Sequence, residues 1–142
     1  MTRGLLVPWG LRRAAWHEAG HVVAARAVGI RVRSVEVGTR GGATHFALPP
    51  RMTPDAAFRL LVLAVAGEQA ERLRFGRDCG EPWPGAWEGD REIAYDLAGP
   101  AAGVAEGLDP PTAIRLAKAD ARAILRDDWP SVRRVARRLM RG

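Results

Sequence analysis

The chain has 142 residues, 47% apolar and 27% charged, a balance that fits one globular domain over residues 1–142. Its apolar runs are far shorter than the roughly 20 residues of a membrane helix, and residues 1–10 lack a secretion signal. We therefore expect a cytoplasmic protein without a membrane span. The single cysteine, Cys79, excludes an internal disulfide and a cysteine-rich metal site.

The net charge of +6 is carried by 21 arginines and one lysine. This bias is more typical of genome base composition than of selection for phosphate contacts. Five arginines near the C-terminus are expected to form a solvated helix face opposite Val132, Val135 and Leu139. They are Arg133, Arg134, Arg137, Arg138 and Arg141. No nucleic-acid motif accompanies the charge, so no specific nucleic-acid partner is expected.

Residues 11–28 are predicted to form the first helix, because small or apolar residues recur there at helical spacing. Gly29 follows, where a glycine commonly ends a helix. Two short runs, over residues 32–37 and 43–48, have the composition of strands. Gly41 and Gly42 lie between the two runs and are expected to form a turn. The segment is therefore predicted to be a small hairpin.

Thr53 and Pro54 mark the start of a second long helix, Thr53 as the N-cap and Pro54 at the first helical position. Strong helix formers continue to Arg74, and Gly76 ends the helix. Residues 76–89 are rich in glycine, proline and tryptophan. They are predicted to form an irregular loop.

Three shorter helices are predicted in the C-terminal half. One covers residues 90–98 and stops near Pro100. The next covers residues 110–126 after an Asp109 N-cap, and the last covers residues 128–140. The chain is therefore predicted to be mainly α with a small β-hairpin, an α+β fold.

The motif that carries chemistry is His17-Glu18-Ala19-Gly20-His21. Histidines four residues apart project from one face of a helix, so both can bind one tetrahedral Zn²⁺. Glu18 lies beside that metal, where its carboxylate can take a proton from a zinc-bound water as a general base. Gly20 weakens the middle of a helix by about 1 kcal/mol against alanine, which indicates a packing or access requirement.

A catalytic zinc usually has a third protein ligand. The metzincin extension is excluded, because Ala24 and Ala27 stand where that class has glycine and histidine. The residues alone leave several candidates for the third ligand, the foremost being His45, Glu68, Glu71 and Asp90.

Three segments resemble the peptidase domain of the FtsH family of AAA-linked zinc proteases. Residues 17–23 read HEAGHVV, residues 53–76 form a helix-like stretch that ends in Phe-Gly, and residues 89–98 read GDREIAYDLA. The likeness spans roughly residues 10–98, and the order of the segments is also that of the family.

The resemblance implies a zincin-like helical peptidase domain with Asp90 as the third zinc ligand. It also implies that an edge strand beside the metal binds an extended substrate by backbone pairing. The corresponding residues here are Gly42, Ala43, Thr44, His45 and Phe46.

Two departures from the family limit what the resemblance implies. No P-loop occurs in the 142 residues, so no ATP-driven unfolding is expected of this chain. The loop before Asp90 also differs from the family pattern, which leaves Glu81 or Glu88 as further candidates for the site.

The sequence therefore predicts a stand-alone, ATP-independent zinc metalloendopeptidase that hydrolyses unfolded or extended peptides with Glu18, His17, His21 and Asp90. The alternative is a non-catalytic zinc-binding regulatory or interaction domain derived from such a peptidase. A homo-oligomer and a separate ATPase partner both remain compatible with the sequence.

Overall fold

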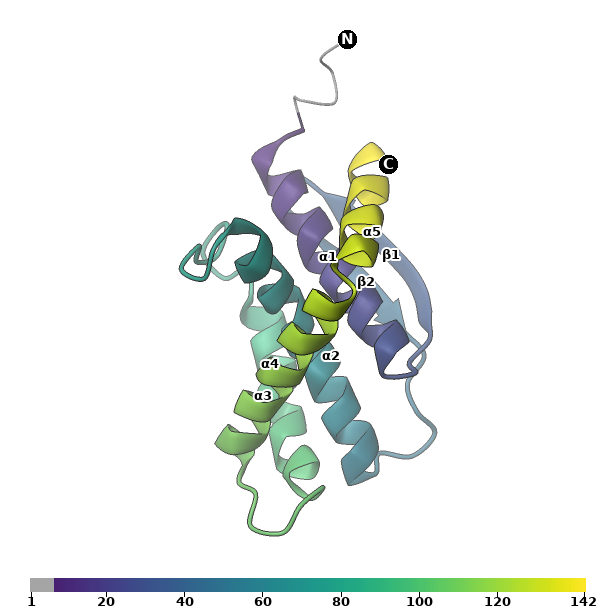
Figure 1. Ribbon diagram of the computed structural model, residues 1–142, viewed down its shortest axis with the longest axis vertical. Helices are drawn as coiled ribbons and strands as arrows, with labels where there is room; N and C mark the ends of the chain where they lie inside the picture. Colours follow the sequence, from purple (N-terminus) through teal and green to yellow (C-terminus); the bar gives the residue numbers. More distant parts are fainter. Residues whose placement is uncertain (1–6) are drawn as a thin grey trace.

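The computed structural model describes residues 7–142, which are mainly helical with one two-stranded antiparallel sheet, as predicted (Figure 1). The elements are, in chain order, α1 (Trp9–Ala27), β1 (Val32–Gly38), β2 (Gly41–Phe46), α2 (Pro54–Phe75), α3 (Glu88–Ala102), α4 (Pro110–Asp127) and α5 (Trp129–Arg141).

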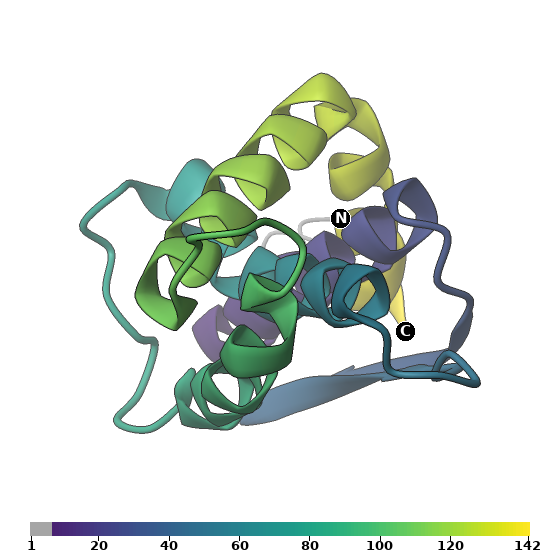
Figure 2. The same ribbon diagram turned by 90° about the horizontal axis from the view of Figure 1, so that it is seen from below.

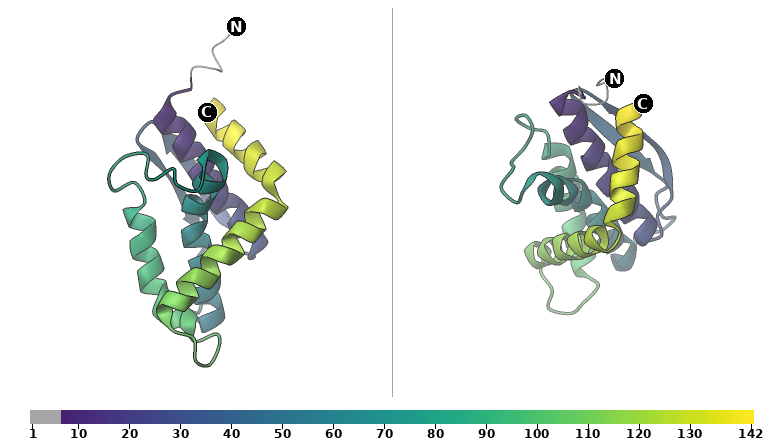
Figure 3. Two further views of the ribbon diagram at one scale, coloured as in Figure 1. Left: turned by 60° about the vertical axis from the view of Figure 1, so that its left-hand side comes forward. Right: turned by 45° about the horizontal axis from the view of Figure 1, so that its top comes forward.

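The two long helices α1 and α2 form the middle of the molecule. The hairpin packs against α1 on one side, the α4–α5 pair covers α1 and α2 on the other, and α3 packs against α2 and α4 (Figure 2). The chain bends between α4 and α5, and the end of α5 lies near the beginning of α1 (Figure 3). Core side chains between these layers are mostly alanine, valine and leucine.

Small residues allow α1 and α2 to approach closely. A Cβ added at Gly20 would lie 2.5 Å from Ala70 Cβ and 2.7 Å from the Ala66 carbonyl oxygen. Ala66 and Ala70 are themselves fully buried. The prediction of a packing requirement at Gly20 is therefore confirmed, and the requirement is contact between backbones.

Side-chain caps begin two of the helices as the sequence predicted. The Thr53 hydroxyl accepts a hydrogen bond from the Ala56 amide at 3.1 Å, and the Asp109 carboxylate accepts one from the Thr112 amide at 2.8 Å. Each cap is followed by proline at the first helical position, where the missing amide proton is not needed.

The hairpin pairs β1 with β2 from Gly38–Gly41 to Val32–Phe46. It begins its return at Gly41, two residues earlier than predicted, because the turn is made by Thr39 and Arg40. Within residues 7–142 the second edge of β2 has no strand partner, so its backbone groups are available for pairing.

The predicted end of α3 near Pro100 was wrong, because the helix continues through this proline to Ala102. Because proline has no amide N–H, the carbonyl oxygen of Asp96 loses its helical hydrogen bond. Both Pro100 and Asp96 are exposed, so water can donate to that oxygen instead. Ala101 and Ala102 beyond the proline are buried in the core. Their burial favours continuation of the helix.

The last helix has the predicted division between an apolar and a basic face. Val132 and Ala136 are fully buried, whereas the five arginines of α5 are exposed. Among residues 7–142, no helix combines the length and apolarity needed to cross a membrane.

Gly20→Ala is expected to lower the free energy of unfolding by about 1–2 kcal/mol, because overlap with the Ala66 backbone outweighs the gain in helix propensity. Gly89→Ala is the matched control, since Gly89 lies in α3 and an added Cβ meets no atom within 4 Å. That change should leave stability unchanged or raise it by up to roughly 1 kcal/mol. Urea denaturation of both variants tests the difference, and a stabilised Gly20→Ala would contradict the crowded crossing.

Candidate metal centre

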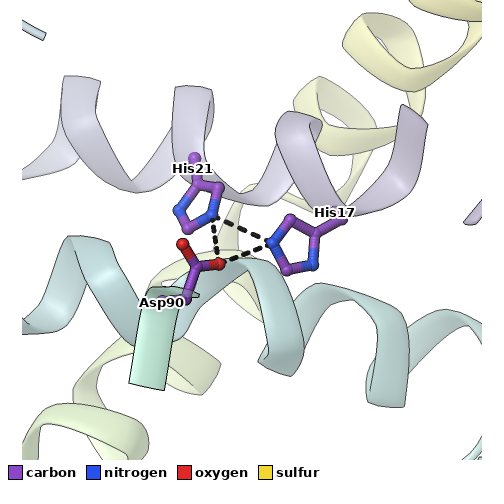
Figure 4. Close-up of side chains that lie close together, drawn as sticks. All are labelled: His17, His21 and Asp90. Atoms are coloured by element: carbon purple, nitrogen blue, oxygen red, sulfur yellow. Dashed lines mark hydrogen bonds and ion pairs between the residues drawn. The ribbon is translucent and has the colours of Figure 1, made fainter. Parts of the chain in front are cut away.

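His17 and His21 project from the same face of α1, one helical turn apart, toward Asp90 at the start of α3 (Figure 4). The two Nε2 atoms lie 3.2 Å apart, and Asp90 Oδ2 lies 2.7 Å from His17 Nε2 and 3.0 Å from His21 Nε2. The structure thus brings together the two histidines of the motif and the carboxylate that the resemblance implied.

The loop before α3 is fixed to the core, which places Asp90. Trp87 is 2% exposed, and its indole Nε1–H donates to Glu71 at 2.5 Å. The Glu81 carboxylate accepts hydrogen bonds from the backbone amides of Gly85 and Trp87. Three residues after the anchored tryptophan, Asp90 reaches the histidines.

The other nitrogen of each imidazole faces an acceptor. His17 Nδ1 lies 2.6 Å from Glu71 Oε2, and His21 Nδ1 lies 2.8 Å from the carbonyl oxygen of Leu63. A carboxylate and a backbone carbonyl oxygen accept hydrogen bonds, so these contacts assign the imidazole proton to Nδ1. Metal-binding histidines commonly have this outer arrangement.

With both protons on Nδ1, the neutral imidazoles direct their two Nε2 lone pairs at one point. The Asp90 carboxylate oxygen lies at the same point. Three acceptors this close need a shared proton or a cation. Burial opposes protonation of His17, but its hydrogen bonds to Asp90 and Glu71 raise its pKa to about 10. Burial likewise opposes protonation of His21, yet the charge of Asp90 raises its pKa. The surroundings therefore favour positive charge at this point.

The charges and donor spacing also fit a divalent ion. The centre holds the buried carboxylates Glu18 and Glu71 and the half-buried Asp90, and one buried guanidinium, Arg13, pairs with Glu71, so three carboxylates are matched by one fixed positive charge when the histidines are neutral. Tetrahedral ligands about 2.0–2.1 Å from zinc lie about 3.3–3.4 Å from one another. The three donor atoms here are slightly closer, and two imidazoles with one carboxylate form a donor set typical of catalytic zinc.

Glu71 connects the centre to the rest of the core. Its Oε1 accepts from Arg13 Nε at 2.6 Å, while Oε2 faces both His17 Nδ1 and Trp87 Nε1. Arg13 in turn donates to the carbonyl oxygen of Gly80 at 2.6 Å. One carboxylate therefore orients a histidine and also ties the loop before α3 to α1.

Gly67 in α2 lies directly against the Nε2 atoms of His17 and His21. A Cβ at this position would overlap His17 Nε2 and lie 2.6 Å from His21 Nε2. Only a residue without a side chain lets α2 lie against the two donors. The sequence analysis did not single out Gly67. The signal was the same as at Gly20, a glycine in the middle of a predicted helix.

Glu18 lies beside the donors and is held by the hairpin. The Thr44 hydroxyl donates to Glu18 Oε1 at 2.6 Å, and Glu18 is 5% exposed. Thr44 was expected to contact substrate. Its observed contact is with the side chain predicted to be the general base.

Two hollows meet at the centre and share Glu18, Gly42 and Asp90 as lining residues. The polar hollow, of about 280 Å³, lies toward Arg40 and the tryptophan loop. The apolar hollow, of about 380 Å³, is lined by side chains from β2, the segment after it, α2 and α3. Its apolar residues include Phe46, Leu48, Met52, Leu60, Leu63, Ile93 and Leu97.

The other candidate ligands have different partners. Glu68 pairs with Arg72 at 3.0 Å and with Arg91 at 3.1 Å, which hold its pKa below the usual range although burial opposes this. Glu81 caps the loop, and Glu88 is exposed at the start of α3.

The predicted substrate edge is only partly at the centre. Gly42, Ala43, Thr44 and Phe46 line the apolar hollow. His45 is exposed, pairs across the sheet with Ser34, and lines neither hollow.

Comparison with known proteins assigns no family to this arrangement. No family model matches the chain, and no curated protein or solved structure is similar enough to match it.

Asp90→Asn is expected to weaken zinc binding at least about 100-fold, since even the outer partners of ligands are typically worth 10–100-fold. Asp96→Asn, the same change at an exposed position of α3, should leave the affinity unaltered. Competition with a chromogenic chelator measures both. If Glu68→Gln lowers the affinity and Asp90→Asn does not, the third ligand is assigned wrongly.

Gly67→Ala is expected to reduce zinc affinity at least about tenfold, because the new methyl group displaces the imidazoles from their common point. Gly20→Ala crowds the same pair of helices against Ala66 and Ala70 of α2, so it should lower zinc affinity less than Gly67→Ala, whose methyl group meets the donor atoms themselves. Zinc affinity of the folded fraction should therefore separate the two variants. Equal affinities would show that Gly67 affects packing alone.

Proposed function

We propose that this chain is a zinc-dependent metallopeptidase, zincin-like and similar to the FtsH-type peptidase domain, that hydrolyses extended peptides without ATP. The observation that carries the proposal is the Glu18 carboxylate, held by Thr44 beside the convergent His17, His21 and Asp90 donors. A purely structural zinc site has no use for such a base.

When bound, zinc supplies a Lewis acid that polarises the scissile carbonyl and makes water more acidic. His17, His21 and Asp90 would hold it, with Glu71 and the Leu63 carbonyl keeping both imidazoles in the ligating tautomer. Proton transfer and positioning of the substrate would be carried out by side chains and backbone groups of this chain.

Glu18 has the position that proton transfer requires. Oε1 accepts a hydrogen bond from the Thr44 hydroxyl, and within residues 7–142 no protein group donates to Oε2. That oxygen is therefore free to take the proton of the attacking water and to deliver it to the leaving amine. The hydrogen bond from Thr44 limits rotation of the carboxylate, so Thr44 is a positioning residue in this proposal.

The shape of the site favours an extended peptide as substrate. The unpaired edge of β2 can add a peptide strand by backbone hydrogen bonds, and Gly42 to Thr44 of this edge line the apolar hollow. Hollows on both sides of the donors allow a chain to continue past the cleaved bond, as an endopeptidase needs. The apolar hollow fits a bulky apolar side chain, which a folded protein would keep in its core.

Glu18→Gln is expected to reduce cleavage of unfolded casein by about 10²–10⁴-fold, the usual contribution of a general base, with zinc content unchanged. Glu36→Gln provides the matched control, because Glu36 is exposed on β1. Rates are compared in zinc-loaded protein and after chelation.

Undiminished activity in Glu18→Gln would contradict the assigned base. Stoichiometric zinc without cleavage of casein or of a peptide panel would favour the alternative, a zinc-binding regulatory or interaction domain.

A further inference from the structure

A third hollow, which we call the arginine hollow, lies where α5 crosses the first half of α1. It has a volume of about 400 Å³ and is lined by Arg12, Arg74, Arg133, Arg137 and the indoles of Trp16 and Trp129. It shares no lining residue with the two hollows at the metal centre. No aspartate or glutamate lines it.

The four guanidiniums come from three different helices. Arg12 belongs to α1 and Arg74 to the last turn of α2, while Arg133 and Arg137 are four residues apart on α5 and so share a face. None of the four forms an ion pair with a carboxylate of residues 7–142. Like charges gathered without a counter-charge repel one another, so an anion at this place would relieve that repulsion.

Aromatic rings fix part of this arrangement. The Arg74 guanidinium lies over the Trp16 ring at 5.2 Å and over the Phe75 ring at 5.0 Å. Trp16, 5% exposed, stacks on Trp129 with ring centroids 5.4 Å apart and an angle of 19° between the planes. Stacking holds the guanidinium without using its N–H donors, which stay free for a ligand.

We propose that the arginine hollow binds a small anion with a phosphate chain, such as pyrophosphate or the diphosphate of a nucleotide. Guanidinium groups pair with phosphate oxygens through two parallel hydrogen bonds. A phosphate chain carries several charges in a small volume and so matches four guanidiniums better than a single carboxylate does. The volume lies in the range of small-molecule sites, roughly 300–1,000 Å³.

A matched pair of double variants tests the proposal. Arg133→Gln with Arg137→Gln removes two lining charges, whereas Arg134→Gln with Arg138→Gln removes two charges from the same helix outside the hollow. All four arginines are exposed, so both variants should fold, which circular dichroism checks. Titration calorimetry at about 0.15 M salt, where surface charges are screened beyond about 8 Å, measures binding of pyrophosphate, ADP, adenosine and sulfate.

Wild-type protein should bind pyrophosphate or ADP more tightly than sulfate, and adenosine weakly or not at all. The lining variant should lose about tenfold or more in affinity, while the control variant stays within about twofold. Equal affinity for pyrophosphate and ADP would identify a free phosphate chain as the ligand. Tighter binding of ADP would identify a nucleotide as the ligand.

Three results would overturn the proposal. One is that pyrophosphate and ADP bind no better than sulfate, and another is that both double variants weaken binding equally, as a diffuse basic surface would. Binding that neither variant weakens would place the anion elsewhere, for example at the metal centre.

Discussion

The close crossing of α1 and α2 is the constraint on which the rest of the structure depends. Gly20 allows the backbone of α2 to touch α1, and Gly67 allows α2 to lie against the imidazoles of His17 and His21. At this separation Glu71 and the Leu63 carbonyl, both in α2, reach the outer nitrogens of the same imidazoles. A larger spacing would leave those nitrogens without acceptors and the two lone pairs without a common direction. The helix packing and the chemistry thus have one geometric cause.

Helix α1 contributes to two different sites through two of its faces. One face presents the histidines and Glu18 toward the hairpin and α3, and the other presents Arg12 and Trp16 toward α5. Glu71 lies between α1 and the tryptophan loop, so the loop that delivers Asp90 is tied to a residue that also orients His17. Position and protonation at the centre are therefore set by one network, and within residues 7–142 no buried side-chain nitrogen or oxygen lacks a hydrogen-bond partner.

Much of the fold could be predicted because its signals are local. Thr53 and Asp109 are followed by proline, a pattern that the backbone of a helix start requires by itself. The end of α3 could not be predicted, because burial of Ala101 and Ala102 outweighs the local effect of Pro100. Burial depends on contacts with distant parts of the chain, which the few residues around Pro100 do not indicate. For the site, spacing alone places His17 and His21. Asp90 is 69 residues away from His21 and was singled out only by resemblance. Glu71 has the sequence surroundings of an ordinary exposed glutamate, and nothing local indicates that Arg13, His17 and Trp87 will enclose it.

The distance along the chain between His21 and Asp90 has a further consequence. An ion held by both would join the first helix to the third across 69 residues. Closing a loop of that length lowers the entropy of the unfolded chain by an amount that a disulfide of the same span would provide, on the order of 4 kcal/mol at room temperature. With Cys79 as its single cysteine, this chain has no internal disulfide to do so. The centre that we propose for hydrolysis would then also serve as a reversible cross-link, and the helix that supplies Asp90 would be the element whose anchoring varies most with the supply of metal.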